Sequence, residues 1–191
     1  MANLYVISGC NGAGKTTVSY TILPEILQCK EFVNADEIAK GLSPFQPDKV
    51  AIQAGRLMLD RISDLMQKQV DFAFETTLST KSYVQLIKRA KASGYNITLI
   101  YFWLNSPDLA TERVKLRVFS GGHDIPEAVI HRRYKAGLKN LFNLYLPIVD
   151  YWMIFDNSAR PEIFVAEGYG NNELTICNQD IYNKILLYDK R

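Results

Sequence analysis

Short apolar runs alternate along this chain with longer stretches in which apolar residues recur at helical spacing. The runs typical of strands are residues 4–7, 31–35, 72–74, 97–104 and 151–155. The helical stretches between them are residues 18–27, 48–69, 80–92, 107–119 and 126–145. Strands that alternate with helices favour βαβ units. The pattern therefore predicts an α/β fold with a mostly parallel five-stranded sheet flanked by helices.

The pattern changes after residue 158. Residues 162–167 and 173–177 are separated by a glycine- and asparagine-containing turn, which is typical of a hairpin, and residues 180–188 have helical character. At 191 residues the chain is near the size of one domain of ~150 residues with a small addition. We expect a single domain over residues 1–191, with a core at 1–158 and a C-terminal hairpin and helix appendage at 159–191.

Composition limits the classes of partner. Hydrophobic residues make up 48% and charged residues 22%, and the net charge is +2, so a long nucleic acid bound through a global field is not expected. The cysteines Cys10, Cys29 and Cys177 have neither zinc nor redox spacing, which favours free thiols. No apolar run approaches the ~18 residues of a membrane helix, and residues 1–3 lead directly into a strand pattern. We expect a cytoplasmic protein without membrane contact.

A glycine-rich segment between the first strand and the first helix carries the clearest chemistry. It matches the phosphate-binding pattern G-x-x-x-x-G-K-[ST] over Gly9, Cys10, Asn11, Gly12, Ala13, Gly14, Lys15 and Thr16. Its backbone N–H groups and the helix N-terminus would bind phosphate oxygens. Lys15 would contact the β- and γ-phosphates, the Thr16 hydroxyl would bind Mg²⁺, and Thr17 would donate to the α-phosphate. The pattern predicts a P-loop NTPase fold that binds ATP and Mg²⁺.

Two classes of P-loop protein lack support. The chain has no Asn-Lys-x-Asp motif, with which GTPases read guanine. The strand at 72–74 continues into Glu75-Thr76-Thr77 rather than the Asp-Glu pair of motor and transporter ATPases. A kinase acting on a small molecule fits the remaining pattern.

Asp36 follows the second strand, and ligands of open parallel sheets lie beyond the carboxyl ends of the strands. A carboxylate there could accept a proton from an acceptor hydroxyl, so we assign Asp36 as the catalytic base, with helix capping as its alternative role. Glu75 ends the next strand and could bind the acceptor or a water on Mg²⁺. Asn157 follows the fifth strand and could read the edge of the base, although turn chemistry also accounts for it.

Positive charge for the transferred phosphoryl group comes from two helices around Gly121-Gly122. Arg113 and Arg117 lie four residues apart and therefore share a helix face. The second helix would bring Arg132 or Arg133 to the site from the other side. The glycine pair would be the hinge of a helical lid that excludes water. We assign Arg113 to the nucleotide, Arg117 and Arg132 to catalysis, and Arg133 to the acceptor, leaving open which of Arg132 and Arg133 faces the site.

Together these segments, with His123 through Pro126 after the glycine pair, resemble the zeta-toxin-like P-loop kinases, and most of all a short branch often described as ABC-type ATPases. The resemblance covers about residues 3–158. It implies ATP- and Mg²⁺-dependent phosphorylation of UDP-N-acetylglucosamine at its 3′-hydroxyl, and a small antitoxin protein over the ATP site. It also implies Asp36 as base, Lys15 on phosphate, Glu75 with Thr76 on the acceptor, and arginines on the lid.

Two other functions remain open on the residues alone. One is a kinase that acts on a polynucleotide end, which would need a basic channel near Asp36. The other is a nucleotide-binding ATPase module that signals to a partner protein by closing its lid.

Overall fold

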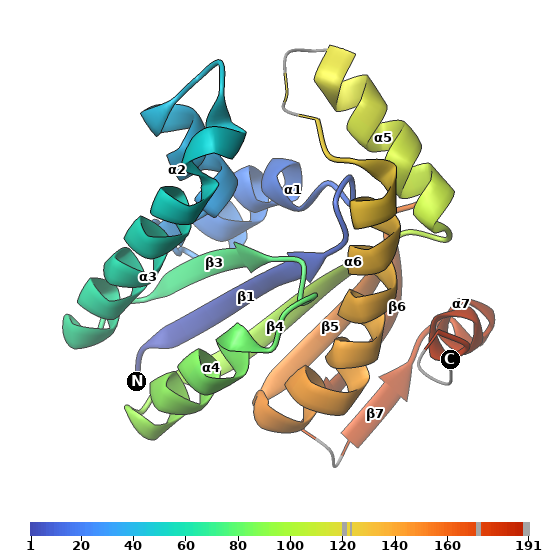
Figure 1. The fold of residues 1–191 in the computed structure, drawn as a ribbon. Helices are drawn as coiled ribbons and strands as arrows, with labels where there is room; N and C mark the ends of the chain where they lie inside the picture. The colour runs from blue at the N-terminus through green and yellow to red at the C-terminus, as the bar shows by residue number, and fades with distance from the viewer. Residues whose placement is uncertain (120–121, 123, 171–172, 189–191) are drawn as a thin grey trace.

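A central sheet organises the molecule, which a computed structural model describes over residues 1–119, 122, 124–170 and 173–188. Within these residues its strands are β1 (Asn3–Gly9), β2 (Phe32–Val33), β3 (Phe72–Thr76), β4 (Asn96–Trp103), β5 (Tyr151–Asp156), β6 (Ile163–Tyr169) and β7 (Glu173–Ile176). Their order across the sheet is β2-β3-β1-β4-β5-β6-β7 (Figure 1). The first five strands are parallel, and β6 and β7 are antiparallel. The predicted parallel α/β core is confirmed.

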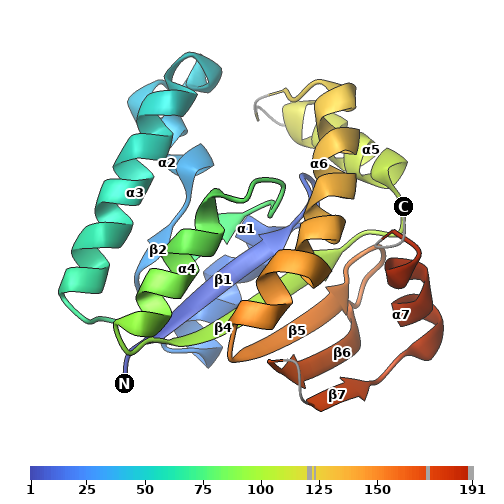
Figure 2. The ribbon, with the colours of Figure 1, turned by 60° about the horizontal axis from the view of Figure 1, so that its bottom comes forward.

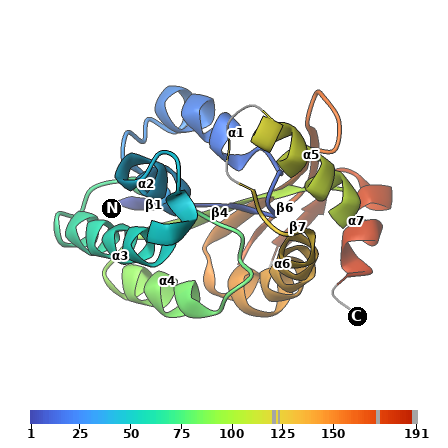
Figure 3. The same cartoon turned by 45° about the horizontal axis from the view of Figure 1, so that its top comes forward.

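Helices cover both faces of the sheet. They are α1 (Lys15–Thr21), α2 (Ala35–Leu42), α3 (Ala51–Gln67), α4 (Ser82–Ala92), α5 (Pro107–Phe119), α6 (Glu127–Asn140) and α7 (Gln179–Leu186). Short π-helical segments at Ile22–Ile26 and Leu141–Tyr145 extend α1 and α6, and 3-10 turns lie at Pro47–Val50 and Leu146–Ile148. In Figure 3, α1 and α5 lie on one side of the sheet and α3, α4 and α6 on the other. No helix among the described residues is long and apolar enough to cross a membrane.

Burial on both faces explains the composition of the central strands. In β4 every residue from Ile97 to Trp103 is buried, so this part of the strand has no face exposed to solvent. The same holds for residues 4–9 of β1. A parallel sheet covered by helices on both sides requires such uniform apolar runs. The polar residues that follow these strands are consequently gathered at one edge, where the carboxyl ends of the parallel strands meet.

The C-terminal segment extends the sheet. Strand β6 pairs with β5 from Tyr151↔Tyr169 to Asp156↔Ile163, and β7 pairs with β6 (Figure 2). The sheet therefore has seven strands among the described residues, rather than the five that the sequence predicts. The predicted hairpin is present, and α7 packs its Tyr182 against Phe142 beyond α6. The hairpin contributes Val165 and Ala166, both fully buried, to the main core.

A helix that the sequence pattern did not predict follows β2. Residues 35–42 form α2, in which the apolar residues Ala35, Ile38, Ala39 and Leu42 recur at helical spacing. The Asn34 side chain caps it by accepting hydrogen bonds from the backbone N–H groups of Asp36 and Glu37. The cap is therefore Asn34, and the carboxylate of Asp36 is left to face the solvent side of the first turn.

Replacing Val165 by alanine tests whether residues 159–191 unfold with the core. We expect a loss of about 2 kcal/mol in the free energy of unfolding, because two buried methyl groups are removed and a cavity is left. Urea denaturation followed by circular dichroism measures it. Leu174→Ala, at a side chain of the same hairpin that is 52% exposed, should change stability by less than about 0.5 kcal/mol. Equal midpoints for the two variants would mean that the hairpin is a separate appendage.

Candidate functional site

The loop at residues 9–14 is fixed by backbone geometry. Gly9 has a φ of +142° and Gly14 a φ of +78°, which L side chains rarely adopt. A Cβ on Gly9 would lie 2.3 Å from the Phe102 carbonyl oxygen, and one on Gly14 would lie 2.7 Å from Nδ2 of Asn157. Both contacts are closer than real atoms allow. The loop therefore needs glycine both for its turns and for its close packing on β4 and on the end of β5.

Asn157 lies beneath this loop. It is 2% exposed, and its Nδ2 donates a 2.8 Å hydrogen bond to the carbonyl oxygen of Ala13. It is not among the residues that line the cavity described below. The sequence leaves both base contact and turn chemistry open for Asn157, and the hydrogen bond to Ala13 makes its amide a support for the loop.

Cys10 also faces inward from the loop. Its carbonyl oxygen accepts a 3.0 Å hydrogen bond from Nζ of Lys15. Burial raises the pKa of its thiol to about 12. The backbone of Cys10 thus contributes to the site, while its thiol stays protonated and unreactive at neutral pH.

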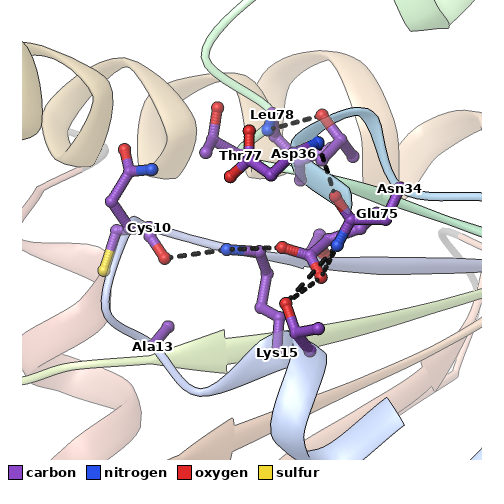
Figure 4. A network of polar contacts seen from close by, with 12 residues as sticks. Cys10, Ala13, Lys15, Asn34, Asp36, Glu75, Thr77 and Leu78 are labelled. Carbon is purple, nitrogen blue, oxygen red and sulfur yellow. Dashed lines mark hydrogen bonds and ion pairs between the residues drawn. The ribbon is translucent and has the colours of Figure 1, made fainter. Parts of the chain in front are cut away.

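A compact polar cluster lies at the carboxyl ends of β1, β2 and β3 (Figure 4). The carboxylate of Glu75 is its centre. Oε1 lies 3.4 Å from Nζ of Lys15, and the two side chains are only 11% and 6% exposed. Oε2 accepts hydrogen bonds from Oγ1 of Thr16 at 2.7 Å and from Nδ2 of Asn34 at 2.9 Å. The predicted phosphate-binding lysine and Mg²⁺-binding threonine are therefore brought together around one nearly buried carboxylate.

Asp36 lies two residues beyond Asn34, in the first turn of α2. Its backbone N–H donates to Oδ1 of Asn34 at 2.8 Å, and its side chain is exposed and lines the cavity. The ring of Tyr83 lies nearby on α4, and burial, with Asp36 as a smaller cause, raises the pKa of this tyrosine. Asp36 is consequently a carboxylate with access to solvent and to any ligand in the cavity.

Four arginines reach the same cavity from α5 and α6. Arg113 donates from Nη2 to the carbonyl oxygen of Ser158 at 2.9 Å, and Arg133 donates from Nη1 to Oδ1 of Asn11 at 3.3 Å. Arg117 and the exposed Arg132 complete the set. Gly121 of the predicted hinge and the nearby His123 lie outside the described residues. Gly122 donates its N–H to the carbonyl oxygen of Arg117 at 2.9 Å.

The segment from the end of β3 to the start of α4 forms a wall rich in hydroxyl groups. Its lining residues are Thr76, Thr77, Ser79, Thr80 and Ser82. Helix α6 and its extension hold this wall through hydrogen bonds from Asn140 Nδ2 to the Leu78 carbonyl oxygen, 2.8 Å, and from the Tyr145 hydroxyl to the Thr80 carbonyl oxygen, 2.6 Å. The hydroxyl groups are thus presented from a fixed backbone.

Together these elements enclose a cavity of about 720 Å³. Among the described residues its lining includes five basic side chains, Lys15 and the four arginines, and two acidic ones, Asp36 and Glu75. The volume falls in the range of small-molecule sites, and the excess of positive charge suits phosphate groups. The adjacent hydroxyl of Thr16 and carboxylate of Glu75 are hard oxygen donors, which suit Mg²⁺.

Most of the residues that the sequence analysis assigned to the site line this one cavity. They are Asn11, Gly12, Gly14, Lys15, Thr16, Thr17, Asp36, Glu75, Thr76, Arg113, Arg117, Arg132 and Arg133. Gly9, Cys10 and Ala13 shape the loop from outside the lining, as Asn157 does.

Several further residues line the cavity without having been expected from the sequence. They are Asn34, Ala35, Thr77, Ser79, Thr80, Ser82, Tyr83 and Ala136. For Asn34 a signal was available, because an asparagine directly after a strand and before two acidic residues is a favourable helix N-cap. The hydroxyl residues offered no comparable signal, since their spacing is that of an ordinary polar turn.

One protein family and one curated relative match this chain in sequence. The model of the zeta toxin family matches residues 2–164. An uncharacterized protein of Haemophilus influenzae is 33% identical over 126 residues, which are 66% of this chain and 88% of that protein.

Solved structures share the fold. Crystal structures of the AvrRxo1-ORF1:AvrRxo1-ORF2 complex, one with sulphate ions and one with ATP, match with TM-scores of 0.78 and 0.75 at 18% and 17% identity. Each match covers 97% of this chain but 63% of the other chain, so this chain spans less than two thirds of that relative's length. A structure of the PezAT chromosomal toxin–antitoxin system of Streptococcus pneumoniae matches with a TM-score of 0.65 at 16% identity, over 100% of this chain and 85% of that chain.

Asn157→Ala distinguishes a residue that supports the loop from one that reads the base. We expect binding of ATP, GTP and inorganic tripolyphosphate to weaken alike, by roughly tenfold, because a buried hydrogen bond worth about 1–1.5 kcal/mol is lost. Isothermal titration calorimetry measures all three. Asn143→Ala removes a comparable amide–carbonyl bond on the surface, 2.8 Å to Lys139, and should leave binding unchanged. Weaker binding of ATP alone would restore the base-reading role.

Thiol labelling tests the inertness of Cys10. Burial raises the pKa of Cys10 to about 12 and that of Cys29 to about 11, so at pH 8 only about one Cys10 side chain in ten thousand is a thiolate. Iodoacetamide should therefore modify the exposed Cys177 first, with Cys10 reacting faster as the pH rises toward 12. Mass spectrometry of the labelled peptides measures the rates, and urea-unfolded protein should lose the difference. Rapid labelling of Cys10 in the folded protein would contradict its burial.

Proposed function

The chain belongs to the zeta toxin family, and we propose that this ATP-dependent kinase transfers the γ-phosphate of ATP to the 3′-hydroxyl of UDP-N-acetylglucosamine. The observation that carries the proposal is the single cavity in which a phosphate loop, a solvent-accessible carboxylate and four arginines meet. We assign the reaction to the cytoplasm, where ATP is abundant and free thiols such as Cys10, Cys29 and Cys177 persist.

The loop and α1 would hold the nucleotide. Backbone N–H groups of residues 9–14 and the N-terminus of α1 would bind the phosphates, as helix N-termini bind anions in general. Nζ of Lys15 would leave the Glu75 carboxylate for the β- and γ-phosphates. The ATP present in a structure of the AvrRxo1 complex supports this choice of nucleotide.

Thr16 would bind Mg²⁺ directly, and Glu75 would bind it or one of its waters. The ion supplies neutralisation of charge on the β- and γ-phosphate oxygens when it is bound. Because the Thr16 hydroxyl and the Glu75 carboxylate already lie 2.7 Å apart, little rearrangement of these side chains is required.

Asp36 would act on the acceptor. Its carboxylate takes the proton of the attacking hydroxyl as the new oxygen–phosphorus bond forms. The bond from the γ-phosphorus to the bridging oxygen breaks, and its electron pair leaves with ADP. Arg117 and Arg132 stabilise the charge on the phosphoryl group in transit, while Arg113 holds the nucleotide.

The wall of hydroxyl groups would bind the acceptor. The hydroxyl residues from Thr76 to Ser82 line the same cavity as Asp36, together with Glu75 and Arg133. Hydroxyl side chains exchange hydrogen bonds with sugar hydroxyls in either direction, and arginine binds phosphate, so the lining suits a nucleotide sugar.

A protein partner is the further element of the proposal. The PezAT system and the AvrRxo1-ORF1:AvrRxo1-ORF2 complex are each assemblies of two proteins. By analogy, a small antitoxin would cover the ATP site of this chain and block the nucleotide.

Asp36→Asn tests the base directly. We expect kcat for transfer from γ-labelled ATP to UDP-N-acetylglucosamine to fall by about 10²- to 10⁴-fold, because the amide cannot take the proton. The KM for ATP should stay within about threefold, since Asp36 does not bind the nucleotide in this mechanism. Separation of labelled products by anion-exchange chromatography measures both constants. Glu37→Gln, an acidic neighbour that pairs with Lys40 at 2.7 Å, is the matched control and should retain full activity.

Where the label goes distinguishes the other functions. Label at the end of an added oligonucleotide would support a polynucleotide kinase. Label released only as free phosphate would support a nucleotide-binding module. Either result, with no labelled nucleotide sugar, would overturn the proposed acceptor.

A further inference from the structure

Asn34 uses both ends of its side-chain amide. The residue lies between β2 and α2 and is 6% exposed. Its Oδ1 accepts hydrogen bonds from the backbone N–H groups of Asp36, at 2.8 Å, and Glu37, at 3.4 Å. Its Nδ2 donates to Oε2 of Glu75 at 2.9 Å and lies 3.4 Å from Oγ1 of Thr16. One buried side chain therefore joins the helix that carries Asp36 to the pair of residues assigned to Mg²⁺ (Figure 4).

The chemistry of these neighbours determines the orientation of the amide. Two N–H donors face Oδ1 and a carboxylate faces Nδ2, so a flipped amide would set like against like on both sides. An N-cap requires only the oxygen, and serine or threonine supplies that as well. The nitrogen is thus the part of Asn34 that helix capping does not explain.

We propose that Asn34 is a positioning residue that couples the binding of Mg·ATP at Thr16 and Glu75 to the placement of the Asp36 carboxylate. The inference rests on the proposed function of Asp36 and deepens it. A ligand that orders Thr16 and Glu75 also orders the Nδ2 end of Asn34. Because Oδ1 of the same side chain accepts the N–H of Asp36, fixing the Asn34 amide also fixes the first turn of α2.

Asn34→Ser separates the two ends of the amide, because serine keeps a cap oxygen and lacks the nitrogen. Asn34→Thr is a second such variant in case the first folds poorly. Asn178→Ser is the matched control, since Asn178 caps α7 through its Oδ1, 3.1 Å from the N–H of Ile181, away from the cavity. All three variants are compared with the parent protein in urea denaturation, so that a loss of cap alone is visible.

Amide hydrogen exchange is the readout that needs no acceptor. In the parent, the magnesium complex of the non-hydrolysable analogue AMP-PNP should slow exchange over residues 34–42 by at least about fivefold, the low end of ordinary coupling between sites. In Asn34→Ser at saturating analogue the slowing should fall below about twofold, while Asn178→Ser should match the parent. Equal slowing in the parent and in both Asn34 variants would overturn the inference.

Kinetics supply the second readout, with UDP-N-acetylglucosamine as the probe. Asn34→Ser should lower kcat by about tenfold with the KM for ATP within about twofold, because the interaction acts on the placement of the base. In an Asp36→Asn background the same change should cost almost nothing, since residues that act through one another are not additive. Additive losses would overturn the inference. Should no acceptor be labelled while the exchange coupling is present, the proposed acceptor fails and the coupling stands.

Discussion

The nearly buried carboxylate of Glu75 is the interaction on which the site depends. A charge at this depth requires partners, and Glu75 has three: the ammonium of Lys15, the hydroxyl of Thr16 and the amide of Asn34. These partners come from α1 and from the junction of β2 and α2, on either side of β3. Removing the carboxylate would take the ion pair from Lys15 and the shorter of the two Nδ2 hydrogen bonds from Asn34, so the local arrangement of three elements depends on this one group.

The order of the parallel strands brings these side chains together. Strands β2, β3 and β1 are neighbours, so the residues that follow them emerge side by side at one edge. In Figure 1, α2 and the start of α3 lie to the left of the space above that edge, and α5 and α6 lie to its right. Helix α6 has two roles, because it carries Arg132 and Arg133 and also holds the hydroxyl-rich wall through Asn140. Basic side chains and hydroxyl groups are therefore presented to one cavity from the same scaffold.

Strands β4 and β5, on the other side of β1 from β3, support the phosphate loop. Gly9 packs against the carbonyl oxygen of Phe102, and Asn157 bonds to Ala13 from the end of β5. Strand β5 is itself hydrogen-bonded to β6 and is therefore not an edge strand of the sheet. A parallel strand with an unpaired edge would expose its backbone groups, and the C-terminal hairpin satisfies them on that side. Strands β5, β6 and β7 thus stabilise a site although none of their residues lines the cavity.

The sequence by itself determined the features that are local. The phosphate loop, the uniformly apolar strands and the arginines four apart on a helix are set by backbone conformation and by periodicity over a few residues, so Lys15, Thr16, Asp36 and Arg117 could be named without a structure. Only the tertiary structure decided how distant segments meet. The amide of Asn34 donates to Glu75, which is 41 positions away, and the amide of Asn157 donates to Ala13, which is 144 positions away. Strand β6 pairs with β5. No local pattern encodes such pairings, because they depend on which strands lie side by side and on the space left between them.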